Sequence, residues 1–124
     1  SMILPCIASG NRVVAVPSLK AALIVADFYQ LLDTSDVPGG VINLVTGVPS
    51  ELATVLAAHD DVAAIWAVGP ADECEQIKKE SAGNLKSVWT SDGKSPDWYD
   101  SQAEGSSWLE RATQVKNIWV PYGE

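Results

Sequence analysis

Short apolar runs alternate with longer mixed segments over residues 12–89 of the chain. The runs are rich in Val, Ile and Trp and most are flanked by Gly, Pro or Asn, which is typical of strands that are buried on both faces. The segments between them are long enough for helices of about two to four turns. The predicted strands are 12–16, 41–45, 62–68 and 85–89, and the predicted helices are 20–32, 51–58 (with Ser50 as its N-cap) and 71–81. This alternation predicts an α/β fold, a parallel sheet with helices on both faces.

The last quarter of the chain has a different composition. Residues 91–105 are rich in Ser, Asp and Gly and predict an irregular connection, and residues 109–113 predict a helical turn. Residues 114–120 alternate sufficiently to predict a final strand at or beside the sheet edge, ended by Pro121. An exposed edge strand can pair with another chain.

The predicted helix 20–32 is apolar on nearly all sides. Between Ala21 and Leu32 only Asp27 and Gln30 are polar. A surface helix of a small α/β domain normally has one apolar stripe. The pattern therefore predicts that a partner or another segment covers this helix, although single exposed apolar residues are common and leave an unburied outer face as the alternative.

Composition excludes several function classes. The 124 residues are 47% hydrophobic and carry a net charge of −8. Since phosphate backbones and anionic lipid surfaces attract basic patches, we expect neither nucleic acid nor membrane as a partner. The longest apolar stretch, residues 21–26, is too short for a membrane span. We expect a cytoplasmic protein with Cys6 and Cys74 reduced.

Few side chains could hold a metal or form a catalytic pair. Two Cys and one His cannot make a four-ligand Cys/His zinc site, so no metal is expected. His59 precedes Asp60 and Asp61, but without a placed Ser or Cys it is predicted to lie at a solvated helix end, facing the terminal carbonyls. The carboxylates of Asp72, Glu73 and Glu75 suit the first turn of a helix.

Two other patterns bear on class and assembly. A receiver or flavodoxin-like binding module is disfavoured, because no carboxylate follows the first strand and no Gly-rich phosphate loop is present. Trp66 and Trp89 are predicted in the core, within strands. Trp98, Trp108 and Trp119 are predicted either to form an oligomer contact or to pack back onto their own sheet.

Several segments resemble consecutive landmarks of the aldehyde dehydrogenase superfamily. They are residues 4–14 (LPCIASGNRVV), Pro17-Ser18, residues 36–47 (DVPGGVINLVTG) and residues 84–86 (NLK), in the family's order and spacing. The likeness covers residues 3–96, and residues 36–47 are its most specific part. It implies a Rossmann-like cofactor-binding domain from an NAD(P)-dependent oxidoreductase family.

The resemblance also marks the family's cofactor positions, at Val16, Pro17, Ser18, Gly47 and Gly69. The family has a lysine at Val16 and a glutamate at Leu19, both of which contact the ribose, and a serine that meets the pyrophosphate at Pro70. Neither Val16 nor Leu19 has a side chain that forms hydrogen bonds, and Pro70 has no backbone N–H. We therefore expect no bound cofactor, with NAD as the alternative.

The family's catalytic positions are also replaced. The position of its general base falls on Thr90 or Ser91, neither of which is a base near neutral pH. Asp92 is a displaced carboxylate. Cys6 and Cys74 match no nucleophile position and are predicted to be core thiols. We therefore assign no catalytic residue, and the chain is not expected to be an enzyme by itself.

The chain is most similar to the truncated, cysteine-less C-terminal unit of family-16 aldehyde dehydrogenases, and it lacks the first strand and helix of the cofactor fold. In this interpretation residues 1–96 form a partial cofactor-binding domain, and residues 97–124 form a linker and an oligomerisation-type strand. The expected function is structural, in a homo-oligomer or with a partner aldehyde dehydrogenase domain. The alternative is an NAD-binding module that serves an active site on another segment or chain.

Overall fold

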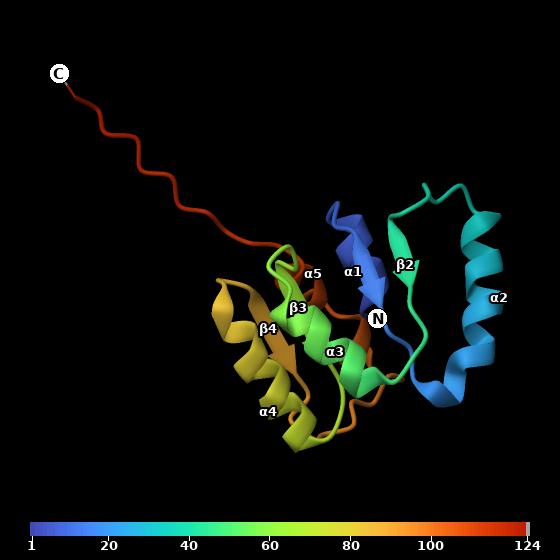
Figure 1. Cartoon of the computed structure of the whole chain (residues 1–124). Helices are drawn as coiled ribbons and strands as arrows, with labels where there is room; N and C mark the ends of the chain where they lie inside the picture. The colour runs from blue at the N-terminus through green and yellow to red at the C-terminus, as the bar shows by residue number, and fades with distance from the viewer. Residues whose placement is uncertain (124) are drawn as a thin grey trace.

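Four short parallel strands form the middle layer of the part that the computed structural model describes, residues 1–123 without the side chain of residue 102 (Figure 1). They are β1 (Val13–Ala15), β2 (Ile42–Leu44), β3 (Ala64–Ala67) and β4 (Ser87–Thr90). β1 pairs with β2, with Val13 opposite Ile42, and β3 pairs with β4, with Ile65 opposite Val88. The arrows of β1, β2 and β4 point the same way in Figure 1, so the strands end at a common edge.

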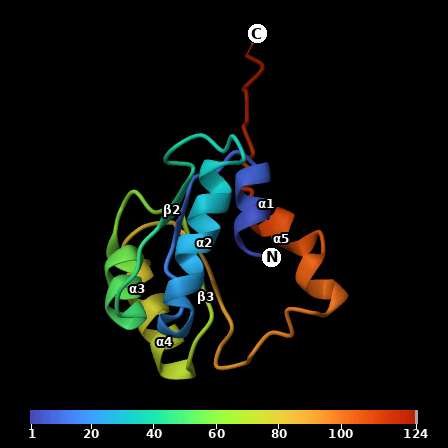
Figure 2. The ribbon, with the colours of Figure 1, turned by 90° about the vertical axis from the view of Figure 1, so that its right-hand side faces the viewer.

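Helices cover both sides of this layer. The α-helices are α1 (Ile3–Ala8), α2 (Ala22–Asp33), α3 (Pro49–Ala58), α4 (Ala71–Glu80) and α5 (Ser107–Arg111), and the 3-10 turns are η1 (Leu19–Ala21), η2 (Ser81–Gly83) and η3 (Ser101–Glu104). Figure 2 shows α3 and α4 on one side of the strands and α1 and α5 on the other. The predicted α/β fold with helices on both faces is confirmed.

The strands form two separate pairs, whereas the sequence predicted one sheet. Within residues 1–123, no backbone hydrogen bond joins β1 to β3. Alternate residues of a parallel strand direct their N–H and C=O groups to opposite sides. Val13 and Ala15 bond to β2, so the backbone groups of Val14 point to the unpaired side of β1. Val14 is 48% exposed, although parallel strands are normally buried on both faces.

Helix α3 begins two residues earlier than its sequence predicted. Pro49 occupies the first turn and Val48 is the N-cap, so the prediction of Ser50 as N-cap was wrong. Proline favours the first helical position, because its φ is already helical and its missing N–H would have no intrahelical partner there.

The predicted strand at residues 114–120 is not formed. Residues 114–123 extend away from the other elements (Figure 1), and within residues 1–123 no hydrogen bond joins them to the rest. Val115 is 89% exposed and Trp119 is 92% exposed. A strand needs a neighbouring strand to satisfy its backbone groups, and the described chain places none beside this segment. The prediction of an edge strand on the chain's own sheet was wrong.

One part of the core lies between helices α3 and α4 and the β3–β4 pair. Ala57, Ile65 and Ile77 are buried there, and Leu56 and Val88 pack against them. The carbonyl end of α3 is held by a lysine from the segment that leads into β4. Lys86 Nζ donates to the carbonyls of Ala57 at 2.6 Å and His59 at 2.8 Å.

His59 is the exposed C-cap of α3, so its predicted place at a solvated helix end is confirmed, but its imidazole does not face the terminal carbonyls. Its Nδ1 accepts a hydrogen bond from the backbone N–H of Asp61 at 3.2 Å, as a local turn. The cation that complements the negative end of the α3 dipole is Lys86, whose long side chain reaches the carbonyls from outside the helix.

The other part of the core is a cluster of tryptophans. The indole of Trp108 in α5 is 7% exposed. Its ring centroid lies 5.3 Å from that of Trp66 in β3, 5.0 Å from that of Trp89 in β4 and 6.3 Å from that of Trp98. The guanidinium of Arg111 stands 5.6 Å from the centroid of Trp89. Trp66 and Trp89 are half-buried strand residues of this cluster, and Trp108 packs back onto its own strands, whereas Trp119 does not.

We expect Trp108→Ala to lower the free energy of unfolding by about 3–5 kcal/mol, because it removes a buried indole and leaves a cavity among three rings. Urea denaturation followed by far-ultraviolet circular dichroism measures the change. Tyr99→Ala is the matched control, since this aromatic side chain is fully exposed at 101% and should change stability by less than about 0.5 kcal/mol. Equal losses of unfolding free energy in the two variants would contradict the role of Trp108 at the centre of the tryptophan cluster.

Candidate functional site

The positions that the family resemblance assigns to the cofactor lie just after the strands. Val16, Pro17 and Ser18 follow β1, Gly47 follows β2 and Gly69 follows β3. Ligands of open parallel sheets bind at these carboxyl ends. The structure therefore brings the predicted positions to the edge where a nucleotide would bind in such a fold, and the groups present there decide whether one fits.

The positions after β1 and β2 serve the local backbone. Ser18 is the N-cap of η1, and its Oγ accepts a hydrogen bond from the backbone N–H of Lys20 at 3.3 Å. A Cβ added at Gly47 would lie 2.9 Å from Leu52 Cδ1. Gly47 is thus accounted for by the close packing of α3 against the end of β2. Val16 is half-buried and has no side-chain donor.

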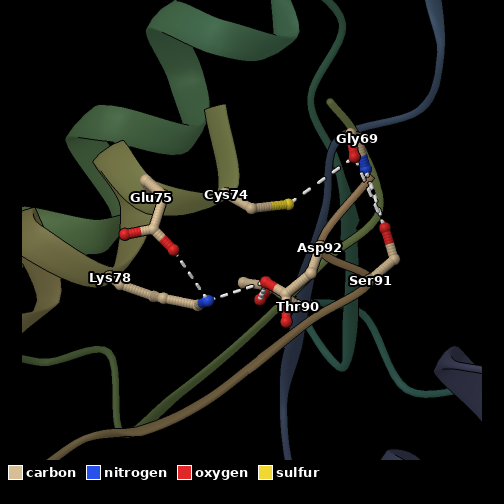
Figure 3. A network of polar contacts seen from close by, with 7 residues as sticks. All are labelled: Gly69, Cys74, Glu75, Lys78, Thr90, Ser91 and Asp92. Atoms are coloured by element: carbon tan, nitrogen blue, oxygen red, sulfur yellow. Dashed lines mark hydrogen bonds and ion pairs between the residues drawn. The ribbon is translucent and has the colours of Figure 1, made fainter. Parts of the chain in front are cut away.

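The position after β3 is filled by the chain's own groups (Figure 3). The backbone N–H of Gly69 donates to Ser91 Oγ at 3.3 Å, and the Gly69 carbonyl accepts from the Gly93 N–H at 3.2 Å and from Cys74 Sγ at 3.6 Å. A Cβ at Gly69 would lie 3.4 Å from Glu73 Oε2, so a carboxylate stands over this glycine. An incoming phosphate would meet both this negative charge and an N–H that is already bonded.

The two helix starts at this edge are also unsuited to an anion. Helix α3 has Pro49 and Glu51 in its first turn, and α4 follows Pro70 and has Asp72 and Glu73 in its first turn. Prolines remove backbone donors, and carboxylates already occupy the positive ends of both helix dipoles. The prediction that acidic residues lie in the first turn of this helix is confirmed for Asp72 and Glu73 and was wrong for Glu75, which lies in the second turn and pairs with Lys78.

A small hollow lies beside the first turns of α3 and α4. The hollow between α3 and α4, lined by Ser50, Glu73 and Gln76 among others, has a volume of about 50 Å³. Small-molecule and cofactor sites are typically about 300–1,000 Å³. The residues at this edge therefore do not fit the pyrophosphate of a dinucleotide.

The displaced carboxylate, Asp92, belongs to an exposed ion-pair network (Figure 3). Its Oδ1 lies 2.7 Å from Lys78 Nζ and accepts a hydrogen bond from Thr90 Oγ1 at 2.6 Å, and Lys78 also contacts Glu75 at 3.1 Å. The hydrogen bond from Lys78, followed by that from Thr90, holds the pKa of Asp92 below its ordinary value. A lower pKa makes the carboxylate a weaker proton acceptor, which is unfavourable for a general base.

The neighbours of Asp92 have structural partners as well. Thr90 donates to Asp92, and Ser91 is buried against Gly69. The participation of Lys78 was not anticipated from the sequence. Its pairing with Glu75 follows from helical spacing, but its pairing with Asp92 depends on how α4 lies across the end of β4.

The two cysteines lie at different depths in the structure. Cys74 is 1% exposed, as predicted for a core cysteine. Cys6 is only half-buried in α1, so its prediction as a core thiol was wrong. Its Sγ donates to the Met2 carbonyl at 3.3 Å, and burial raises the pKa of the thiol. A raised pKa disfavours the thiolate form that nucleophilic chemistry needs. In the described part of the chain, no three His, Cys, Asp or Glu side chains gather as a metal site.

The fold and the groups at this edge define an α/β unit that is similar to a cofactor-binding domain. Comparisons with known proteins show the family to which the chain belongs. The sequence pattern of the aldehyde dehydrogenase family matches residues 1–114, so the chain belongs to this family. It is 38% identical over 93 residues to (Z)-2-((N-methylformamido)methylene)-5-hydroxybutyrolactone dehydrogenase of Acinetobacter baylyi, a match that covers 74% of this chain and 19% of that protein.

Solved structures give the same result. The chain superimposes on an aldehyde dehydrogenase from Bartonella henselae with a TM-score of 0.67 and 31% identity, covering 71% of this chain and 18% of that one. It also superimposes on an aldehyde dehydrogenase C variant from Pseudomonas syringae, solved with NAD⁺ and octanal, with a TM-score of 0.68, 33% identity and the same coverage. The chain thus spans about a fifth of the length of these relatives. Among residues 1–123, no helix is both long enough and apolar enough to cross a membrane.

The ion pair gives a pH-dependent prediction. Because the folded state lowers the pKa of Asp92, the pair contributes stability above the unfolded-state pKa, and this contribution is lost as pH falls through the folded value. Removing the lysine in Lys78→Met should raise the Asp92 pKa towards its ordinary value. Carboxyl-carbon NMR titration measures it, with Lys79→Met on the same helix as the control. An unchanged midpoint in Lys78→Met would show that the ion pair does not form.

Proposed function

We propose that this chain is a non-catalytic domain of the aldehyde dehydrogenase family that holds subunits or neighbouring domains together. In this proposal it corresponds to the truncated unit that the sequence suggested, with residues 1–96 as the cofactor-fold part and residues 97–124 as the connecting part. The replacement of the family's general base by Thr90 or Ser91 supports it, as does the edge at Gly69 that the chain fills with its own side chains.

The observation that carries the proposal is the exposed area. The chain exposes 9285 Å² at a mass of 13.2 kDa. A folded monomer of this mass exposes roughly 6,400 Å², so this chain leaves roughly 2,900 Å² more than the monomer relation predicts. A standard protein–protein interface buries about 800 Å² per partner. The excess is large enough for more than one such contact.

Many large apolar side chains are exposed, and helix α2 contributes several of them. Its inner stripe, Val25, Phe28 and Leu32, is half-buried, but none of its residues is fully buried. Next to this stripe, Ile24 is 66% exposed and Leu31 is 61% exposed. Contiguous apolar surface of this kind marks an interaction site. The exposed apolar surface of this helix supports the proposal of a protein partner, and it agrees with the apolar pattern of the helix sequence.

The partner in the proposal is a second copy of the chain or another aldehyde dehydrogenase domain, in the cytoplasm. With twice as many acidic as basic residues, 16 against 8, the surface does not favour nucleic acid.

The alternative function is an NAD-binding module that serves an active site on another segment or chain. The glycines that are retained at the strand ends, Gly47 and Gly69, support this alternative. The packing of Leu52 on Gly47 and the carboxylate of Glu73 over Gly69 favour the structural role instead.

Sedimentation velocity tests the assembly role. We expect the protein to self-associate at concentrations well above micromolar, or to bind a partner domain of its family, and we expect Ile24→Gln with Leu31→Gln to weaken that association at least tenfold by making the exposed face of α2 polar. Asp33→Asn, on the opposite side of the same helix, is the control. A monomer at every concentration, with no association to a family partner domain, would contradict the proposal.

A further inference from the structure

The outward face of α2 carries two opposite charges on either side of an apolar pair. Lys20 lies in η1, which leads directly into α2, and Leu23, Ile24 and Asp27 follow at spacings of three, four and seven residues. Residues at these spacings lie along one side of a helix. Leu23 is 89% exposed and Ile24 is 66% exposed, and the two charged residues are exposed as well. We call these four residues the α2 stripe.

Neither charge of the α2 stripe forms an ion pair within residues 1–123. Lys20 and Asp27 are separated by about 10 Å along the helix axis, which is two turns rather than the single turn at which helical side chains pair. Two charges without an ion-pair partner, with exposed apolar side chains between them, form a surface that a partner of complementary charge can cover.

The α2 stripe is accessible to another molecule. Figure 1 shows α2 as the outermost element on one side of the described chain, and Figure 2, in which that side faces the viewer, shows no element in front of it. The inner stripe of the helix, Val25, Phe28 and Leu32, is half-buried towards the rest of the chain. The outward face can therefore contact another helix without any rearrangement of the fold.

The order of groups along the α2 stripe is self-complementary. The apolar pair, Leu23 and Ile24, lies midway between Lys20 and Asp27 in the sequence. When two such helices pack antiparallel, a two-fold axis can pass between Leu23 and Ile24. Each Lys20 then lies opposite the Asp27 of the other copy, and Leu23 of each copy lies opposite Ile24 of the other. One symmetry operation thus pairs all four charges and covers both apolar pairs.

We propose that two copies of this chain associate through α2, packed antiparallel, with reciprocal ion pairs between Lys20 of each copy and Asp27 of the other. This inference rests on the assembly role proposed above, and it names the partner and the arrangement of the contact. The contact is isologous, since each copy supplies the same stripe.

The charge order favours a second antiparallel copy over other occupants. A parallel arrangement would place Lys20 opposite Lys20 and Asp27 opposite Asp27, and like charges that face each other across an interface are unfavourable. An unrelated helix would need an acid, two apolar residues and a base at matching positions, whereas a second copy always supplies them in the reverse direction. Two chains of net charge −8 repel each other, and the reciprocal ion pairs offset part of this repulsion.

The size of the helix predicts weak, reversible association. The 12 residues of α2 extend over about 18 Å. A contact made by one helix of this length from each copy is smaller than a standard interface and falls among the transient contacts below about 1,200 Å² in total. Leu31, which is 61% exposed, adds apolar surface beyond Asp27. A dimer of this kind forms at concentrations above micromolar, and added salt weakens its exposed ion pairs.

A charge-swap experiment tests this arrangement with full-length chains. Lys20→Glu alone and Asp27→Lys alone each place like charges opposite each other twice in a homodimer. Each variant should therefore associate about tenfold more weakly than the parent chain at low salt. An equal mixture of the two variants should form a heterodimer with the affinity of the parent, because every charge again faces its opposite. The variant with both substitutions should dimerise like the parent for the same reason. Sedimentation velocity with one variant fluorescently labelled measures these dissociation constants.

Asp33→Lys and Lys79→Glu are the matched controls. They change the net charge by the same amounts as the two test variants, but both residues lie outside the α2 stripe and are exposed. Equal effects in test and control variants would assign the effect to net charge and overturn the inference. Recovery of association in the mixture would support it, since a misfolded variant could not restore binding.

The remaining outcomes separate this inference from the assembly role. If the charge variants leave the dissociation constant unchanged while Ile24→Gln with Leu31→Gln raises it, the antiparallel arrangement is overturned and the assembly role stands. The same holds if the single variants weaken association and the mixture does not restore it. A parent chain that binds a partner domain of its family but not itself overturns this inference alone, whereas a chain that binds neither overturns both.

Discussion

The packing of Trp108 against Trp66 and Trp89 holds together a chain whose strands do not form one continuous sheet. No backbone hydrogen bond joins the β1–β2 pair to the β3–β4 pair within residues 1–123, so side chains must bridge them. Helix α5 does so: Trp108 contacts both β3 and β4, and the Ala112 carbonyl at its end accepts a hydrogen bond from Asn11, just before β1. This short helix takes the place that a continuous ladder of backbone hydrogen bonds has in larger α/β domains.

The same arrangement explains which surfaces remain for function. The carboxyl edge is occupied from within, by Ser91 and Glu73 at Gly69 and by the Lys78–Asp92 pair beside it. Exposed apolar groups lie instead on α2, on the open hollow lined by α1 and on residues 114–123. These surfaces are suited to protein contact, which is the role proposed for this member of the aldehyde dehydrogenase family.

Much of the fold could be predicted from the sequence, because strand and helix positions follow from local patterns. The runs around Val13 and Ile65 and the helix that contains Cys74 were placed within a few residues. Contacts between distant segments could not be predicted in this way. The bond from Lys86 to the end of α3, the pairing of Lys78 with Asp92 and the bridge from Asn11 to α5 depend on tertiary geometry. The alternating pattern of residues 114–120 favours a strand, but the structure forms none there, because a strand needs a neighbouring strand and local sequence does not say where that neighbour lies. For the site, the family positions were located at the strand ends, whereas the closure of Gly69 by Ser91 and Glu73 was not foreseen.

The central claim is that the edge that binds the dinucleotide in an active cofactor domain is closed here by the chain's own groups. Isothermal titration calorimetry of the full chain with NADH tests it most directly. The account predicts no saturable heat up to millimolar cofactor, because Glu73 and the Gly69 hydrogen bonds occupy the place of the pyrophosphate. Saturable binding in the micromolar range, lost when Gly69 is replaced by valine, would contradict the account and establish the chain as a cofactor-binding module.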